Sequence, residues 1–533
     1  MQGAAGLGLA ALARPGLGWA LGPAPPALHD LCVSTARPLA GDHPRFATVD
    51  PHRRGRKLAV ISFRLEQPAT VKVQALRTAV RHDTEVWRSV RRLEPGEHRL
   101  FWRPRKDLPA RTYLLRLTVR DAGGRTRVYG ARPPRRRLFR GPVVRLLGVE
   151  ATWARRSYTP GQRAALGVLA SARSVTVQFF RAGGEPIWTS RNDELVGSPV
   201  GKPGRYGWRG RSDRRHVLRL KLGDWPSGVY FARLETDDGR VGFAPFVLRP
   251  KKLGTARVAV VVATNTWQAY NFRDADGDGW GDTWYQGGNP PVRLDRPFLK
   301  RGVPPRFKYH DRGWLTWLHR SGKQVDFLAD DDLERLPGGQ RLRELYDLVV
   351  FPGHSEYMTR HAFDTLVRYR DLGGNLMFLS ANNFFWCVRK RGRRMRRYRL
   401  FRELGRPEAT LLGAQYRAND NGSIQRPFAV RNTAAAPWLW EGTGLTEGST
   451  FGEFVGGFGT EIDATTKDSP AGTIVVAEIV DIFGPGITAQ MTYYETPSGA
   501  RVFSAGALDF GGSVTFWPMR RMLDNLWRRL AAP

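Results

Sequence analysis

The sequence predicts a multidomain chain, with an all-β N-terminal half followed by an α/β part that has a mainly parallel sheet. Its 533 residues exceed the length of one ordinary domain. Short segments of alternating polarity, separated by turn residues, continue to about residue 250. Longer uninterrupted apolar runs, with a helical pattern between two of them, begin at Arg257. We therefore expect the fold class to change near residue 255.

The composition is that of a folded, strongly basic protein. Hydrophobic residues make up 41% of the chain, and 84 Lys and Arg residues oppose 49 Asp and Glu residues, for a net charge of +35. The arginines occur in every region and no nucleic-acid-binding motif accompanies them, so we expect a solvated surface and no nucleic-acid partner. The densest cluster, residues 389–402, predicts an exposed basic loop or helix face. No apolar stretch reaches the roughly 18 to 20 residues that a membrane span needs.

Residues 1–50 are rich in Ala, Gly and Pro and predict a leader and a linker. Residues 3–13 have the length and small side chains of a signal-peptide core, although the basic start of such a peptide is missing. We expect an exported, extracellular protein, and a cytoplasmic one remains the alternative. Cys32 and Cys387 are too few for a thiolate metal site and form one disulfide at most.

Two β-sandwich domains are expected before the α/β part. Residues 51–132 contain several short alternating strands with turns between them, which is the pattern of an immunoglobulin-like sandwich. The arginine- and proline-rich residues 133–142 predict a linker, and residues 143–250 predict a second sandwich. Neither region carries a catalytic signature, so the function has to be sought in a site elsewhere.

Residues 255–533 predict the α/β domain. An amphipathic helix between the third and fourth apolar runs begins after Thr359 and ends before Gly373. The four runs, which predict buried strands, are residues 257–264, 324–333, 346–353 and 375–383. Their order is similar to the sheet of class I glutamine amidotransferases, which implies a nucleophile after the fourth strand. The residues there, Ser380 to Asn383, include no cysteine, so cysteine-dependent amidotransfer is disfavoured.

Polar residues follow three of these strands. Tyr270 comes after the first strand, His354 and Glu356 come after the third, and Asn382 ends the fourth. Because the carboxyl ends of parallel strands share one rim of a sheet, we expect these side chains to converge there. A carboxylate, an imidazole and a phenol suit a hard metal ion. Spacing alone leaves open the alternative of a buried Glu–His hydrogen bond with Tyr270 as a packing residue.

Five segments that keep their order and spacing give this region a more specific resemblance. They are residues 265–271, 293–298, 351–357, 373–386 and 493–506. From about Gly228 to Phe510 the chain resembles the large (β) subunit of N,N-dimethylformamidase. The resemblance implies an enzyme that hydrolyses the C–N bond of a small amide with metal-activated water.

The same resemblance implies a ligand set. That family holds one iron ion on two tyrosines and a glutamate, and these hard anionic ligands favour ferric iron. By position the ligands here are Tyr230, Tyr270 and Glu356, with His354 beside the metal. The resemblance also implies Glu495 as the acid/base group and Asn382 as the group that polarises the substrate. The small partner subunit of that family is not encoded in this sequence, so a partner subunit and a homo-oligomer both remain open.

The acidic insertion that follows the first strand predicts a second metal site. Asp274, Asp276 and Asp278 match the first half of a calcium loop, and Asp282 fits its ninth position. Tyr285 stands at the twelfth position, where an EF-hand requires glutamate, so a full EF-hand is excluded. We expect a shortened calcium loop, and a solvated acidic turn is the alternative.

A second class of function also fits the sequence. The two β-sandwiches and the arginine-rich surface suit a secreted carbohydrate- or surface-binding protein with a degenerate hydrolase pocket. In that case the tryptophans of residues 265–286 would stack on sugars. Retention of Tyr270, Glu356 and Glu495 favours the hydrolase.

Overall fold

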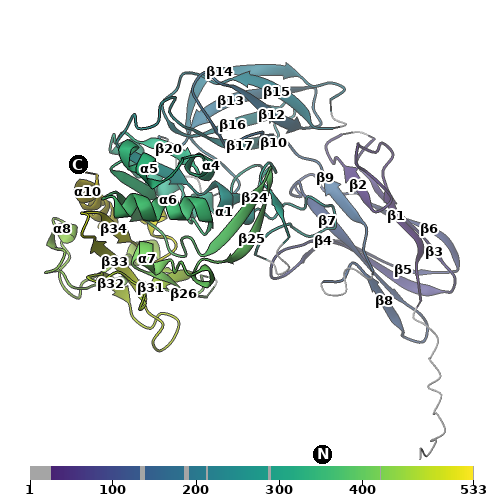
Figure 1. Ribbon diagram of the computed structural model, residues 1–533. Coiled ribbons are helices and arrows are strands. Elements are labelled where there is room, and N and C mark those ends of the chain that lie inside the picture. Colours follow the sequence, from purple (N-terminus) through teal and green to yellow (C-terminus); the bar gives the residue numbers. More distant parts are fainter. Residues whose placement is uncertain are drawn as a thin grey trace, which may run out of the picture.

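The computed structural model describes most of the chain, namely residues 26–53, 55–132, 139–184, 191–211, 214–285, 290–420 and 422–531. Two all-β bodies and a larger body with sheets and helices are evident in Figure 1. The signal-like residues 3–13 and most of the predicted linker, residues 133–138, lie outside the described residues.

The first body is a β-sandwich that begins well before residue 51. One sheet has the strand order β1-β3-β6, and the other has the order β2-β9-β7-β4-β5, with β8 paired to β7. The strands are β1 His29–Ser34, β2 Phe46–Val49, β3 Ala59–Leu65, β4 Ala69–Arg77, β5 Thr84–Leu93, β6 Gly96–Trp102, β7 Thr112–Arg120, β8 Thr126–Tyr129 and β9 Val143–Leu146.

The prediction of a leader and linker for residues 1–50 is therefore wrong from His29 onward. Leu31 and Val33 of β1 are buried in the core of the sandwich, and β1 pairs antiparallel with β3. β2 pairs in parallel with β9, so the predicted start of the second domain at residue 143 belongs to the first. β1 and β2 are short and lie among prolines and glycines, so their own sequences give a weak strand pattern. Pairing with β3 and β9 is what makes them strands.

The second body is also a β-sandwich, with strand orders β10-β12-β15 and β11-β17-β16-β13-β14. Its strands are β10 Glu150–Trp153, β11 Ser157–Tyr158, β12 Arg163–Leu169, β13 Ser174–Arg181, β14 Ser198–Gly207, β15 His216–Lys221, β16 Gly228–Thr236 and β17 Val241–Leu248. The two faces of β16 serve different cores. Tyr230, Ala232 and Leu234 point into this sandwich, whereas Val229 and Phe231 pack against the third body.

The third body is built on a nine-stranded sheet of order β20-β18-β21-β23-β34-β33-β32-β28-β29. Its strands are β18 Val258–Val262, β20 Asp326–Ala329, β21 Leu348–Phe351, β23 Asn375–Phe378, β28 Phe428–Val430, β29 Thr450–Phe451, β32 Ile474–Ile479, β33 Ala489–Glu495 and β34 Arg501–Ser504. Parallel pairings join β20, β18, β21, β23 and β34, and every later pairing is antiparallel. The sheet is thus mixed rather than mainly parallel.

Short helices cover this sheet. They are α1 Thr264–Ala269, α2 Phe307–His310, α3 Arg312–Arg320, α4 Asp330–Glu334, α5 Gly339–Leu345, α6 Arg360–Asp371, α7 Ala409–Leu412, α8 Pro437–Trp440, α9 Phe510–Ser513 and α10 Met519–Leu530, with 3-10 turns η2 Arg402–Leu404 and η3 Glu453–Val455. The predicted start of α6 is confirmed, because the hydroxyl of Thr359 accepts the Ala362 N–H at 3.3 Å. Among the described helices, none is long and apolar enough to cross a membrane.

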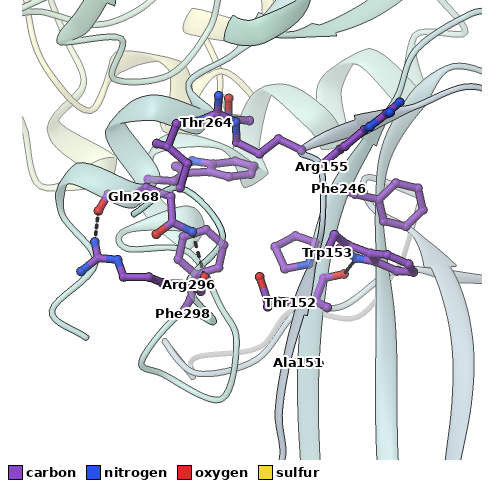
Figure 2. Close-up of a pocket in the computed structure, with 14 residues that line it drawn as sticks. Ala151, Thr152, Trp153, Arg155, Phe246, Thr264, Gln268, Arg296 and Phe298 are labelled. Carbon is purple, nitrogen blue, oxygen red and sulfur yellow. Dashed lines mark hydrogen bonds between the residues drawn. The ribbon is translucent and has the colours of Figure 1, made fainter. Parts of the chain in front are cut away.

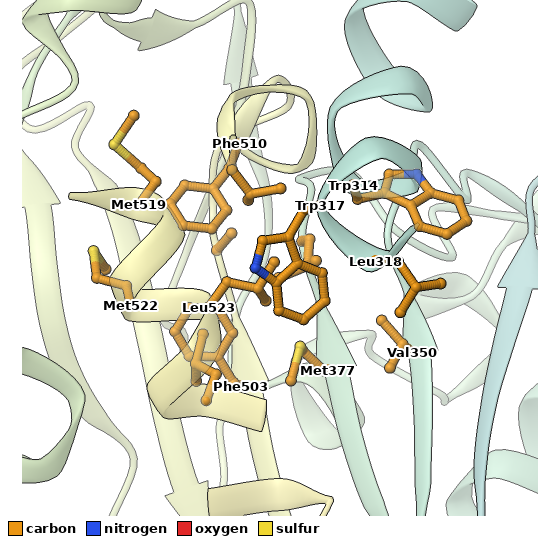
Figure 3. Close-up of a cluster of buried hydrophobic side chains, with 14 of the residues drawn as sticks. Trp314, Trp317, Leu318, Val350, Met377, Phe503, Phe510, Met519, Met522 and Leu523 are labelled. Atoms are coloured by element: carbon orange, nitrogen blue, oxygen red, sulfur yellow. The ribbon is translucent and has the colours of Figure 1, made fainter. Parts of the chain in front are cut away.

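Each face of the parallel strands is buried under a different layer. Val258, Val260 and Val262 face one core, and the intervening Ala259 and Val261 face the other. Figure 3 shows the first core, where tryptophans of α3 meet Phe510 and residues of α10. Burial on both faces explains why these strands are continuous apolar runs without alternation.

Smaller sheets surround the rim of the main sheet. They are the sheet β19-β25-β24-β22 (β19 Val292–Arg293, β22 Tyr357–Thr359, β24 Trp386–Arg391, β25 Arg394–Leu400) and the pairs β26 Gln415–Asn419 with β31 Glu461–Ala464 and β27 Gln425–Arg426 with β30 Phe458–Gly459. The basic cluster at 389–402 is therefore mainly a β-hairpin, and the predicted loop or helix is wrong. Cys32 and Cys387 are both free thiols.

Candidate active site

A pocket of about 900 Å³ lies where the first β-sandwich meets the third body. The turn after β4 and Arg111 form part of one wall, and Tyr270, His354 and Glu356 also line the pocket. The last three follow β18 and β21, so the pocket lies at the carboxyl ends of parallel strands, where ligands of α/β sheets collect.

Tyr270 ends α1 and lies at the floor of this pocket. Its hydroxyl donates a short hydrogen bond to Oε2 of Glu356. The phenol ring is buried, stacked on Tyr285 with ring centroids 3.9 Å apart and on His354 at 5.7 Å. The predicted convergence of Tyr270 with Glu356 and His354 is thus present in the geometry.

His354 lies between two carboxylates. Its Nε2 is 3.5 Å from Oε2 of Glu356 and 3.2 Å from Oε2 of Glu461. Nε2 is buried and makes no geometric hydrogen bond among the described residues, so these two contacts are charge contacts. The Glu–His pair therefore exists as a close charge contact rather than as a hydrogen bond.

Glu461, the first residue of β31, was missed by the sequence reasoning. It lies 79 residues beyond Asn382, in a two-stranded sheet with no local motif, so only the tertiary structure identifies it. Nδ2 of Asn382 donates to Oε2 of Glu461 at 2.8 Å, and the Asn382 N–H donates to Asp463 at 2.8 Å. Asn382 adopts a φ of 55°, a left-handed conformation that asparagine tolerates better than most residues. Its Oδ1 is buried without a hydrogen-bond partner among the described residues.

The charges of this cluster are strongly coupled. Burial, with a contribution from Glu461, raises the pKa of Glu356 to about 7, although His354 opposes the shift. Burial lowers the pKa of His354, but Glu461 and Glu356 outweigh it and leave that pKa above its ordinary value. Burial opposes ionisation of Glu461, yet His354 and Asn382 hold the pKa of Glu461 below its ordinary value. The cluster therefore combines one ionised carboxylate with one that readily carries a proton.

A second phenol accompanies Tyr270. Tyr357 follows Glu356 directly and lines the same pocket, and its ionisation is linked to that of Glu356 and Tyr270. The two tyrosine rings meet edge to face at 5.6 Å. Burial, aided by the charge of Glu356, raises the pKa of Tyr270 and of Tyr357 well above the ordinary value.

Tyr230 does not join this cluster, which corrects the ligand set that the resemblance implied. Its hydroxyl donates to the Pro226 carbonyl at 2.8 Å, and its ring stacks between Trp225 and Phe246 inside the second β-sandwich. The alternation of side chains along β16 is the reason, because only Val229 and Phe231 point toward the third body.

Glu495 is also outside the pocket, which corrects its implied acid/base role. Its carboxylate binds Arg529 at 2.8 Å and accepts the Tyr493 hydroxyl, with 43% of its side chain exposed. Glu495 ends β33 opposite Arg501, the first residue of β34. Because β34 is parallel to β23, this end of β33 lies at the amino-terminal rim of the sheet, opposite the pocket.

The acidic loop gathers three of its four predicted calcium ligands. Carboxylate oxygens of Asp274, Asp276 and Asp282 lie within 4.8 Å of one another. Asp278 is outside this group, and its carboxylate accepts the Trp280 N–H at 2.9 Å. Burial and the neighbouring carboxylates raise the pKa of Asp274 to about 7, as expected for acidic groups crowded without a cation.

The tryptophans of residues 265–286 expose little of their side chains. Trp267, Trp280 and Trp284 are 6%, 3% and 4% exposed and belong to cores. A separate crevice between Trp153 of the second β-sandwich and α1 encloses only about 30 Å³ (Figure 2), or about one water. Trp284 alone of these three lines the main pocket, so the sugar-stacking role that supported the binding-protein alternative has little aromatic surface to rest on.

The fold and the pocket define a β-sandwich protein with a catalytic-type acidic and phenolic cluster at the rim of an α/β sheet. A family model described as "N,N-dimethylformamidase beta subunit-like, C-terminal" matches residues 215–522. The chain belongs to this family. Tyr270, His354, Glu356 and Glu461 lie inside the matched segment, and the first β-sandwich lies outside it.

Two curated relatives carry the name N,N-dimethylformamidase beta subunit, one from Paracoccus aminophilus and one from Alcaligenes sp.. Each is 22% identical over 383 residues, which covers 54% of this chain and 50% of the relative. This chain thus spans about half the length of the curated relatives it matches.

Solved structures add little. The native conformation of E. coli alpha-2-macroglobulin aligns at a TM-score of 0.24 and 11% identity, covering 42% of this chain and 16% of that chain. Superoxide reductase (neelaredoxin) from Ignicoccus hospitalis aligns at 0.14 and 17%, covering 19% and 80%. Scores this low carry no argument about fold or function.

Proposed function

We propose that this protein is a metal-dependent hydrolase of an amide C–N bond. The observation that carries the proposal is the buried cluster of Tyr270, Tyr357, Glu356, His354 and Glu461 at the floor of the pocket. Family membership supports the same reaction class.

The donor atoms of this cluster fit a hard cation such as ferric iron. The phenols of Tyr270 and Tyr357 and the carboxyl of Glu356 meet at one buried point. Burial raises the pKa of all three groups, so they retain protons that a trivalent cation would displace. Two tyrosines and a glutamate is the set that the family resemblance implies, with Tyr357 in place of Tyr230.

When bound, such a cation supplies Lewis-acid chemistry that polarises an amide carbonyl and makes water more acidic. The side chains around it then have separate roles. His354 and Glu461 form a charge pair that accepts a proton from water and returns it to the departing amine nitrogen. Glu461 orients the side chain of Asn382, which lines the pocket. The Asn382 amide group would polarise the carbonyl of the bound substrate. The stacked rings of Tyr270 and Tyr285 narrow the floor and exclude bulk water.

Three further features belong to the same proposal. The parallel strands with a polar rim support an arrangement similar to class I glutamine amidotransferases, without their cysteine nucleophile. The relatives' name as a beta subunit supports assembly with a partner subunit, and a homo-oligomer is the alternative. We also propose that the protein is exported to the extracellular space. There the loop of Asp274, Asp276 and Asp282 would bind calcium.

The first experiment is metal analysis of the purified protein with its visible spectrum. We expect near-stoichiometric iron and a tyrosinate-to-iron charge-transfer band, together with hydrolysis of small amides. Tyr270→Phe and Tyr357→Phe should each reduce the band and the iron content, because each removes one phenolate. Tyr230→Phe is the matched control and should keep both, because its hydroxyl faces Pro226.

A colourless protein that remains metal-free after iron reconstitution would contradict the iron site. Loss of iron in Tyr230→Phe but not in Tyr357→Phe would restore the ligand set that the resemblance first implied. Amide hydrolysis without iron would leave the reaction class standing and remove the cation from it.

A further inference from the structure

The first β-sandwich supplies part of the pocket wall although it lies outside the family-matched residues 215–522. The turn after β4, from Thr78 to His82, and Arg111 just before β7 line the same pocket as Tyr270 and Glu356. Any selectivity that this wall confers is therefore a property of this chain rather than of the matched region.

The wall is fixed to the segment that follows Tyr270. The Thr78 hydroxyl donates to the Gly279 carbonyl at 2.7 Å, and Trp280 is buried among side chains of β4, β7 and β9. A Cβ added at Gly279 would lie 3.0 Å from Leu114, so the loop and the sandwich are in close contact. Packing between the first β-sandwich and this loop therefore fixes the position of Arg111 relative to Tyr270 and Glu356.

Arg111 is a part-buried cation without a carboxylate partner among the described residues. Its Nη2 donates to the Thr78 carbonyl at 2.7 Å, its Nε donates to the Thr112 carbonyl, and its guanidinium lies 5.5 Å from the centre of the Phe272 ring. Nη1 makes no hydrogen bond among these contacts. Burial lowers the pKa of Arg111 to about 10, although the charge of Asp274 opposes the shift.

The other charges of the pocket leave this cation available. Five basic side chains and three carboxylates line it, which is close to the overall ratio of 84 to 49, so the count alone decides nothing. Their pairing does. Glu461 contacts His354, and Asp509 contacts His310 at 3.1 Å, so two of the three carboxylates are already matched by imidazoles. The third, Glu356, accepts the Tyr270 hydroxyl and contacts His354.

We propose that the substrate is an amide that carries a carboxylate, and that Arg111 of the first β-sandwich binds this carboxylate. The proposal rests on the proposed function and names its substrate class. A guanidinium held by two carbonyls and a ring is pre-organised, so it binds a carboxylate with little loss of side-chain entropy. The volume of about 900 Å³ accommodates a ligand much larger than a simple formamide.

The test compares binding of two nearly isosteric amides, N-acetyl-phenylalanine and its neutral carboxamide, by calorimetry on the full-length protein. We expect the acid to bind about tenfold tighter than the carboxamide, the difference expected for one charge-assisted hydrogen bond. Arg111→Gln, which keeps a donor for the Thr78 carbonyl, should abolish this preference, and Arg111→Lys should retain part of it. Arg45→Met is the control, since Arg45 donates to the Arg140 carbonyl.

Equal affinity for the two compounds, failure of the acid to bind, or an unchanged preference in Arg111→Gln would overturn the proposal. Circular dichroism of each variant guards against loss of folding. Turnover distinguishes this result from the proposed function. Selective binding without cleavage of either compound would contradict the hydrolase, whereas cleavage of the neutral amide without preference for the acid would contradict only the role of Arg111.

Discussion

At the scale of single residues, two residues that the resemblance implied are absent from the pocket, and two others with the same functional groups line it. Tyr357 and Glu461 lie in the cluster, while Tyr230 and Glu495 lie in other environments. A phenol and a carboxylate are needed by the chemistry, but many positions can supply them. Only contact with Glu356 and His354 selects the ones that fit the proposed reaction.

The two glutamates allow a direct comparison. Glu461→Gln should lower kcat by about 100-fold or more, because it removes the ionised partner of His354 from the proton path. Glu495→Gln should leave kcat within about twofold, because this side chain only binds Arg529 and Tyr493 on the far rim. Steady-state kinetics on any accepted amide measures both. The opposite order of effects would return the acid/base role to Glu495.

At the scale of elements, strand alternation and chain direction explain the main corrections. One residue along β16 separates a side chain in the sandwich core from one in the domain interface, as Tyr230 and Phe231 illustrate. The antiparallel direction of β33 carries Glu495 to the rim opposite the pocket. The face of β16 and the direction of β33 depend on partner strands that sequence spacing does not reveal.

The acidic loop gives a prediction at this scale. Calcium should raise the melting temperature of the protein, because it would bind the folded state through the three converging carboxylates of Asp274, Asp276 and Asp282. Asp276→Asn should weaken the calcium response, since it removes one of the three converging charges and keeps an acceptor oxygen. Asp278→Asn removes the same charge outside the converging group and should leave most of the response. Thermal melts with and without calcium compare them, and equal responses would favour the solvated turn.

At the scale of the whole molecule, the bodies are joined by partly buried ionic contacts as well as by apolar cores. Asp331 of α4 accepts hydrogen bonds from Arg156 of the second β-sandwich at 2.9 Å and from Lys390 of β24 at 3.1 Å. Burial opposes ionisation of Asp331, but these two cations outweigh it and hold its pKa below the ordinary 3.8. The cluster therefore ties two bodies together through one carboxylate.

This contact predicts a pH dependence of stability. Because the folded-state pKa of Asp331 is lowered, its contribution is fully present above the unfolded value of 3.8 and is lost as the pH falls below it. Asp331→Asn should lower the free energy of unfolding by about 2 kcal/mol at neutral pH, and the difference from wild type should shrink below pH 3.8. Urea titrations at several pH values measure it.

The control for this prediction is Asp107→Asn. Asp107 pairs with Arg105 at 2.8 Å, but both side chains are mostly exposed, so its loss should change stability by well under about 1 kcal/mol. A destabilisation by Asp331→Asn that does not change with pH would show that packing, rather than charge, holds the contact.

The sequence by itself determined where several strands and one helix of the third body lie, and it determined part of the candidate site. Apolar runs identified β18, β20, β21 and β23, the capping threonine located α6, and polar residues after the strands brought Tyr270, His354, Glu356 and Asn382 to one pocket. These features are local, because burial on both faces and the position of a strand's end leave a direct pattern in the chain.

Only the tertiary structure decided which distant residues complete that pocket. Glu461 comes to the pocket from a separate strand pair, and Arg111 comes from the first β-sandwich. Tyr230 lies outside the pocket because side chains alternate along β16. The early strands β1 and β2 likewise gain their place from β3 and β9. Such placements depend on long-range pairing and on the packing of one body against another, and no local spacing in the sequence records either.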